Sequence, residues 1–252
     1  TETIKNRHNH EAFYWYYWSW ILAQRARLEE DDERRLELLK AACQKCKDAI
    51  KLSEDHACAW AGWGSTLMEI AGLENNPEKE KSILKDACNK HRVAVKYDAD
   101  LIGAWHNWGI SLRRLAVLER DPKMQNTLRE EECKMYKEAV KRDEHYVYAW
   151  DDWGTALIEQ ARAAQSKAES QRFLTEANEK CMWAEFISPG FSAYNLACIA
   201  ALQDNRPVCM EWLRKAEEHG ELPSRVHLLN DPDLKNILHE TWFKELISTL
   251  EN

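Results

Sequence analysis

The hydrophobic and polar positions of this chain follow the period of an α-helix, and the helical pattern itself returns every 45 residues. Trp60, Trp63 and Leu67 stand at i, i+3 and i+7, so they share one stripe of a helix. The tryptophan pair occurs four times in this register: Trp15 and Trp18, Trp60 and Trp63, Trp105 and Trp108, Trp150 and Trp153. A fixed period of this size predicts one supersecondary unit stacked on copies of itself, which is a solenoid.

A second helix is expected after each tryptophan-bearing helix; we call the two helix A and helix B. Alanines seven positions apart mark helix B, as in Ala42 and Ala49, whereas the third unit has Glu132 at the first of these positions. Pro77 and Pro122 fall where helix B is expected to begin, and proline is tolerated there. The residue after the second tryptophan is small, which leaves room for a neighbouring helix: Ser19, Gly64, Gly109 and Gly154.

Composition supports an all-helical chain and narrows its partners. The 252 residues include only eight Gly and six Pro, so helix breakers are sparse. The net charge of −8 disfavours nucleic acid and anionic membranes, because both bind basic surfaces. No apolar stretch approaches the roughly 20 residues that span a bilayer, so we expect no direct membrane insertion.

The cysteines fit the repeat better than they fit a metal or redox site. Cys43 and Cys46 form a C-x-x-C, but steps of 45 residues carry Cys46 to His91, Tyr136 and Cys181. Such equivalent positions on successive helices predict buried packing. Thiols without a paired framework favour a reducing, intracellular compartment, which is the cytoplasm or an organelle interior. Metal or small-molecule sensing through Cys43, Cys46 and His91 is a third hypothesis.

The motif Ala-Trp-x-x-Trp-Gly-x-x-Leu, the alanine-marked helix B and the polar turns between units resemble the tetratricopeptide repeat. The usual unit has about 34 residues, and the extra length here lies between Gly64 and Ala87. The resemblance implies an all-α, right-handed α-α superhelix that forms a single solenoid over residues 1–252. Its expected units are 12–55, 56–100, 101–145, 146–189 and 190–220, with a C-terminal cap over 221–252 that contains Asp-Pro-Asp-Leu and Trp-Phe motifs.

In this family helix A lines a concave groove that binds partner proteins. Carried onto this sequence, the resemblance implies a peptide-binding groove made by Tyr16, Tyr17, Trp20, His106, Asn107, Arg113, Tyr148, Asp151, Asp152, Tyr194 and Asn195. His106 with Arg113 would form a cationic spot, and Asp151 with Asp152 an anionic one. The alternative is that these charges only solvate a helix face and pair with each other. The eight register tryptophans are expected in the core, with Trp20 and Trp183 left as exposed candidates.

The sequence predicts a non-enzymatic protein-interaction module. It contains no H-E-x-x-H pair, no phosphate loop and no G-x-S-x-G, so neither catalytic residues nor cofactors are expected. The groove would bind an extended or helical segment of a partner protein, and the chain would act as an adaptor or assembly factor. The alternative is a constitutive subunit or self-assembling scaffold of a larger complex, which uses the convex face and the helix ends. Homo-oligomerisation is therefore left open.

Overall fold

The computed structural model describes the backbone of residues 2–250 and the side chains of residues 8–250. It divides into two compact units, the first ending at Arg142 and the second beginning at Asp143. Unit 1 contains α1 (Glu2–Arg27), α2 (Asp32–Leu52), α3 (Ala57–Gly72), α4 (Pro77–Tyr97), α5 (Ile102–Leu118) and α6 (Pro122–Arg142). Unit 2 contains α7 (Val147–Ala163), α8 (Lys167–Ile187), α9 (Ala193–Leu202), α10 (Arg206–Glu218), α11 (Arg225–Asn230), the short 3-10 helix η1 (Pro232–Leu234) and α12 (Thr241–Ser248).

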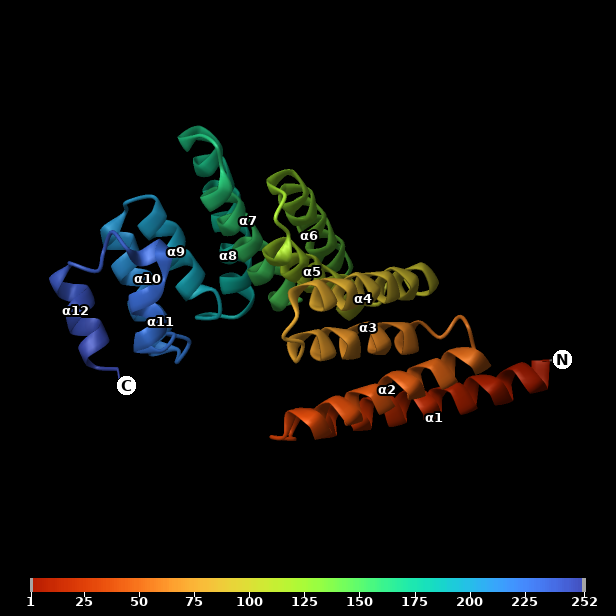
Figure 1. Ribbon diagram of the computed structural model, residues 1–252. Coiled ribbons are helices and arrows are strands. Elements are labelled where there is room, and N and C mark those ends of the chain that lie inside the picture. The colour runs from red at the N-terminus through yellow and green to blue at the C-terminus, as the bar shows by residue number, and fades with distance from the viewer. Residues whose placement is uncertain (1, 251–252) are drawn as a thin grey trace. The chain divides into compact units, whose positions relative to one another are not determined.

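Unit 1 is a stack of three antiparallel helix pairs (Figure 1). Each odd-numbered helix is a helix A that packs on the helix B after it, and α2 and α4 also pack on the next helix A. None of the described helices combines the length and the apolar character needed to cross a bilayer. The whole-chain domain assignment stays a prediction, and the boundary between the units coincides with the end of the third helix B.

The 45-residue period of the sequence is reproduced by the helix boundaries. The B helices begin at 32, 77, 122 and 167 and end at 52, 97, 142 and 187. Pro77 and Pro122 open their helices as predicted. The preceding side chain accepts hydrogen bonds from the first turn, as Asp31 does from the Arg34 amide and Asn76 from the Glu78 amide. Such caps satisfy amides that have no partner within the helix.

The small residue after the second tryptophan lies against helix B of the same repeat, and its size matches the opposing side chain. A Cβ atom at Gly64 would stand 2.7 Å from the His91 ring, and one at Gly109 would stand 2.8 Å from Cζ of Tyr136. In the first repeat the pair is Ser19 with Cys46, whose Oγ and Sγ lie 3.1 Å apart. The predicted close approach of a neighbouring helix is therefore confirmed, and it occurs within each pair.

Most of the paired tryptophans are partly buried or exposed, so the prediction that all eight belong to the core is wrong. Trp153 is 8% exposed, but Trp18 is 50% exposed. The two rings of each pair stack on each other, with centroids 5.7 Å apart for Trp60 and Trp63. A lysine from helix B of the same repeat covers the stack: Nζ of Lys90 on α4 lies 4.0 Å from the centre of the Trp63 ring.

In the second, third and fourth repeats the first tryptophan of the pair also binds the turn before its helix. The indole N–H of Trp60 donates to the carbonyl of Glu54 at 2.8 Å, and Trp105 and Trp150 donate in the same way to Ala99 and Glu144. Each turn lies between two repeats, so the tryptophan holds the connection as well as the helix face. This explains why the first tryptophan of the pair recurs at a position that is not fully buried.

The cysteines of the C-x-x-C are packing residues, as predicted. Cys43 is 6% exposed and Cys46 is fully buried. Burial raises the pKa of Cys43 to about 12 and that of Cys46 to about 11, so both remain neutral thiols. Among the described residues they do not gather with His91 into a set of metal ligands. The grouping on which the third hypothesis depends is therefore not formed.

His91 makes the fold sensitive to acid. It is fully buried, and burial lowers its pKa from 6.5 to about 3. Below pH 6.5 His91 therefore binds a proton in the unfolded chain, whereas in the folded chain it stays neutral until about pH 3. As the pH is lowered through this window, we expect the free energy of unfolding to fall by about 1.4 kcal/mol per pH unit. Urea denaturation at a series of pH values measures the change.

The matched control for this prediction is His91→Cys, because cysteine occupies the equivalent position as Cys46 and Cys181. The substitution should reduce the slope of stability against pH between 6.5 and 5, whatever it does to stability at pH 7. Equal slopes in the wild type and the variant would show that His91 does not titrate on unfolding.

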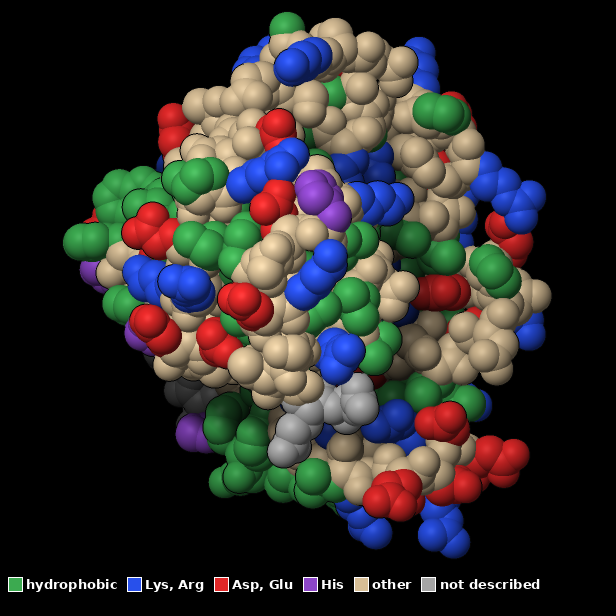
Figure 2. Space-filling view, turned by 90° about the vertical axis from the view of Figure 1, so that its left-hand side faces the viewer, with side chains coloured by type: hydrophobic (Ala, Val, Ile, Leu, Met, Phe, Trp, Pro, Cys, Tyr) green, Lys and Arg blue, Asp and Glu red, His purple; other side chains and the backbone are tan. Residues whose placement is uncertain are grey.

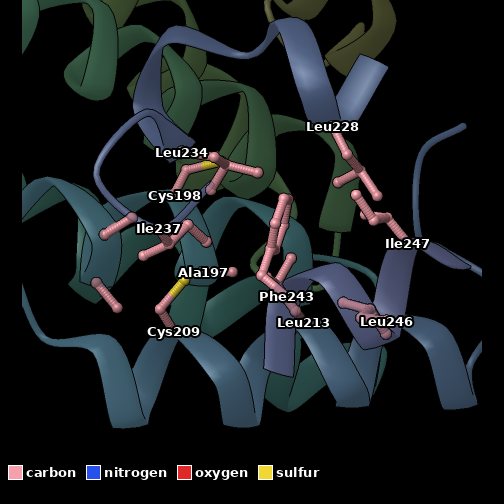
Figure 3. Close-up of a cluster of buried hydrophobic side chains, with 12 residues drawn as sticks. Ala197, Cys198, Cys209, Leu213, Leu228, Leu234, Ile237, Phe243, Leu246 and Ile247 are labelled. Atoms are coloured by element: carbon pink, nitrogen blue, oxygen red, sulfur yellow. The ribbon is translucent and has the colours of Figure 1, made fainter. Parts of the chain in front are cut away.

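Unit 2 contains one long helix pair, α7 and α8, and one short pair, α9 and α10. The segments after α10 cover the short pair. Figure 3 shows Phe243, Leu246 and Ile247 of α12 directed toward the same interior as Leu213 of α10 and Leu228 of α11. The Asp-Pro-Asp-Leu motif contributes Leu234, which is fully buried in this cluster. Residues from the expected cap, 221–252, thus share one hydrophobic core with α9 and α10.

Candidate functional site

In unit 1 the three A helices, α1, α3 and α5, line one open pocket of about 240 Å³. Trp20, which is 48% exposed, and Tyr16 come from α1. The segment of α3 offers mainly small side chains, namely Ala61, Gly62 and Ser65. Since these three side chains are small, the pocket has an aromatic wall on α1 beside a shallow floor on α3.

Gly62 lies close to the Tyr16 ring. A Cβ atom there would stand 3.2 Å from Cε2 of the Tyr16 ring, which is tighter than an ordinary contact. The Tyr16 ring is also 5.4 Å from the His56 ring. Burial raises the pKa of the Tyr16 hydroxyl, so the phenol stays neutral and presents a hydrogen-bonding tip on an apolar body.

Polar groups hold the rest of the pocket in place. The Asn107 side-chain amide donates to Oγ of Ser65 at 3.0 Å, which joins α5 to α3. At the edge, Arg27 donates to Oε1 of Glu69 at 2.6 Å. A pocket with a fixed amide, a hydroxyl and an ion pair around apolar surface suits a peptide, whose backbone needs hydrogen-bond partners and whose side chains need apolar contacts.

Three of the predicted unit 1 residues, Tyr16, Trp20 and Asn107, are brought together in this pocket. Tyr17 is exposed, and its ring stacks on Trp20 with the centroids 5.7 Å apart. His106 is only 8% exposed and lies 5.7 Å from the Tyr136 ring. His106 is therefore buried beside Tyr136 and is not presented on the surface of the pocket.

Arg113 is also inside the unit rather than in a groove. Its Nε donates to Oε1 of Glu132 at 2.7 Å; the Arg113 side chain is 19% exposed and that of Glu132 is fully buried. Its guanidinium also lies 5.5 Å from the centre of the Tyr136 ring. In the sequence Glu132 stands out only as a departure from the alanine pattern, and the ion pair with Arg113 explains that departure.

Unit 2 contains a second pocket, of about 360 Å³, between α7, α9 and the segment around α11. Two predicted residues, Tyr194 and Asn195, line it. Asn195 donates to Oδ1 of Asp151 at 2.8 Å, and Ser192 donates to the same carboxylate oxygen. The Asp151 carboxylate thus binds two neutral side chains of the unit, and the expected anionic spot at Asp151 and Asp152 stays a prediction. Asp152 is half-buried beside it, and Tyr148 is exposed against Phe191.

The charged residues of this second pocket were missed. Arg162 donates two hydrogen bonds to Asp233, which is 3% exposed, and Tyr194 donates to Oδ2 of Asp231 at 2.5 Å. Nε2 of His227 lies 3.6 Å from the same Asp231 oxygen. The Asp-Pro-Asp motif was the signal that could have found the two carboxylates, but it was interpreted only as part of the cap.

Cys198, Asp231 and Asp233 also place three potential metal ligands within 4.8 Å of one another. The donors are already engaged: Asp233 by Arg162, and Asp231 by Tyr194 and by the backbone amide of Asp233. Burial raises the pKa of the Cys198 thiol well above its usual range, so it is protonated. A metal ion would have to displace these partners, and the arrangement fits a structural network better.

No protein-family model matches the chain, and no curated protein matches its sequence. Solved structures do match. The thermophilic TPR protein TTC0263 of Thermus thermophilus matches with a TM-score of 0.55 and 12% identity, over 79% of this chain and 90% of its own. MamA matches with a TM-score of 0.54 and 17% identity, over 76% of this chain and 94% of its own. YrrB, described as a TPR protein with an unusual peptide-binding site, matches with a TM-score of 0.50 and 18% identity, over 78% of this chain and 84% of its own. The chain therefore has the all-α superhelical fold of tetratricopeptide-repeat proteins, built here from longer repeats.

Proposed function

We propose that this chain is a non-enzymatic adaptor that binds a segment of a partner protein, extended or helical, on the surface lined by its A helices. The observation that carries the proposal is the unit 1 pocket, where Tyr16 and Trp20 stand beside the small residues of α3 and the fixed amide of Asn107. An apolar side chain of the partner would rest against Trp20, and its backbone would bind the amide and hydroxyl groups. Tyr194 and Asn195 mark the corresponding surface of unit 2.

Charge supports a protein partner over a nucleic acid. The net charge is −8, and Figure 2 shows acidic and basic side chains interspersed with apolar ones on the face toward the viewer, without a continuous basic area. The rim of the unit 1 pocket likewise carries one charge of each sign, Arg27 and Glu69. A segment with an apolar anchor and mixed charge is therefore the expected ligand.

Random peptides displayed on phage provide a direct probe, since the selection works without a named partner. Peptides selected on the wild-type chain should bind Trp20→Ala at least about tenfold more weakly, because aromatic anchors carry most of the binding energy in such sites. Isothermal titration calorimetry with synthetic copies of the selected peptides measures the change.

The matched control is Val117→Ala, on α5 of the same unit, where Val117 is 68% exposed and outside the pocket. It should leave the affinity unchanged. Selected peptides that bind Trp20→Ala as tightly as the wild type, or a selection without enrichment, would contradict peptide binding at this pocket.

A further inference from the structure

An apolar patch interrupts the charged outer surface of the B helices at one repeat only. On α8, Met182, Trp183 and Phe186 are 43%, 52% and 76% exposed. Nearly all equivalent positions on the three preceding B helices are charged: Lys47, Asp48 and Lys51; Arg92, Val93 and Lys96; Lys137, Glu138 and Lys141. The other repeats provide an internal comparison, because the equivalent positions on their B helices carry mostly charged side chains that suit contact with water. The patch on α8 therefore departs from what folding of the repeat requires.

The patch is an ordered aromatic surface. The Trp183 ring stacks on Trp150 with the centroids 5.9 Å apart, and Phe186 meets Trp183 edge-on at the same distance. An open hollow of about 450 Å³ lies over these side chains, and Asn178 and Glu179 form its border. We call Met182, Trp183 and Phe186 the α8 patch.

A second exposed apolar surface lies on α1. Tyr14 is 68% exposed and Ile21 is 45% exposed. Their equivalents on α3, Ala59 and Thr66, are 0% and 3% exposed. The next helix A shows the same burial, at Ala104 and Ser111. Tyr17 and Trp18, each 50% exposed, complete the surface, which we call the α1 face.

The α1 face occupies a position that another helix covers in the later repeats. Ala59 packs on Ala49 of α2, and Ala104 packs on Ala94 of α4. The small side chains there permit close contact between helices, whereas Tyr14 and Ile21 project into the same space. A helix that docked on α1 would therefore need an apolar surface that accepts large side chains, rather than an alanine ridge.

The charges of the two surfaces are complementary. Residues 12–28 contain no acidic side chain, and Arg25 is exposed beside the α1 face. At the α8 patch the exposed charge on the helix is Glu179, whose side chain is 64% exposed and lies 3.6 Å from Nζ of Lys180. That lysine is only 17% exposed and rests against the Trp153 ring. Opposite charges at the edges of two apolar surfaces favour one register of docking.

We propose that a second copy of this chain is the occupant: the α1 face of one copy docks on the α8 patch of the next, with Arg25 near Glu179. Because the two surfaces differ, each copy contributes its α1 face to one neighbour and its α8 patch to another, so the copies associate head to tail. The pocket residues Tyr16, Trp20 and Asn107 are not part of either surface, but Tyr17 of the α1 face stacks on Trp20. The variant that changes only α8 therefore separates this association from the proposed peptide binding.

Two complementary variants test the contact. Trp183→Glu with Phe186→Lys gives α8 the residues of the third repeat, Glu138 and Lys141, and so removes the patch with substitutions that this fold already accepts. Tyr14→Glu with Ile21→Glu removes the α1 face at two exposed positions. Circular dichroism melting curves establish that both variants are folded.

In sedimentation velocity the weight-average sedimentation coefficient of the wild type should rise with concentration. Each double variant alone should sediment as a monomer. An equimolar mixture of the two variants should form a discrete dimer, since each keeps one functional surface of the opposite kind. A wild type that stays monomeric at all concentrations would overturn the proposal. So would continued assembly of either folded variant, or a mixture that remains monomeric.

Discussion

Replacing Arg113 by Met is expected to lower the free energy of unfolding by about 3–5 kcal/mol, the cost of leaving one member of a buried ion pair without its partner. Glu132 is fully buried, and the Nε of Arg113 lies 2.7 Å from its Oε1. Without the guanidinium, the carboxylate loses a charge-assisted hydrogen bond at a fully buried position, where that loss is costly. Urea denaturation followed by circular dichroism at pH 7 measures the loss.

The double variant Arg113→Met with Glu132→Ala is the decisive control. It installs the pair found in the second repeat, where Met68 and Ala87 occupy these positions. We expect it to recover most of the lost stability, because an apolar pair replaces a buried ion pair at little cost. A double variant as unstable as the sum of the two single variants would show that the residues do not act as a pair.

Replacing Gly109 by Ala is expected to cost about 3 kcal/mol, at the upper end of the effects of overpacking a core. The new methyl group would stand 2.8 Å from Cζ and 2.9 Å from Cδ1 of Tyr136, and closer still to Cε1. Tyr136 is fully buried, so its ring cannot turn away without displacing α5 or α6. The midpoint of urea denaturation should fall without a change in slope.

Gly103→Ala on the same helix is the matched control, because a Cβ atom there meets nothing within 4 Å. Alanine favours the helix over glycine, so the control should be neutral or slightly stabilising. Equal losses from both substitutions would point to a backbone requirement for glycine on α5 rather than contact with Tyr136. Tyr136→Cys, which supplies the smaller residue of the first and fourth repeats, should reduce the cost of Gly109→Ala.

The periodic features of the sequence predicted the fold well. Helix B begins at Pro77 and Pro122 because proline needs no backbone donor there, and the residue before each helix is one that can cap it. The glycine after the second tryptophan was predicted to admit a neighbour, and it does so against the helix B of its own repeat. Such positions are constrained locally, so a single sequence reveals them.

The candidate site was harder to predict because it depends on which side chains bind or enclose one another. Arg113 and His106 look accessible on a helical wheel, but Glu132 and Tyr136 of the next helix enclose them. Asp151 was expected to face a ligand, yet Asn195 and Ser192 from the following repeat bind it. Trp20 and Asn107, which do line a pocket, are uncharged and so need no partner of opposite charge.

The burial of the paired tryptophans was also predicted only in part. Their register predicted burial, but the rings are partly exposed and lie under cationic side chains, as Trp15 and Trp18 lie under Lys45. Cation–π contact at a partly exposed surface stabilises such rings without removing them from water. Hydrophobic pattern alone cannot distinguish this arrangement from a sealed core.

The most direct test of partner binding at the unit 1 pocket is hydroxyl-radical footprinting with and without a selected peptide, resolved by mass spectrometry. Trp20 and Trp183 are 48% and 52% exposed in the single chain, so we expect comparable rates of oxidation at concentrations at which the chain is monomeric. Binding at the pocket predicts that a saturating peptide slows the oxidation of Trp20 and leaves that of Trp183 unchanged. Protection of Trp183 with Trp20 unchanged would contradict the account and move the binding surface to α8.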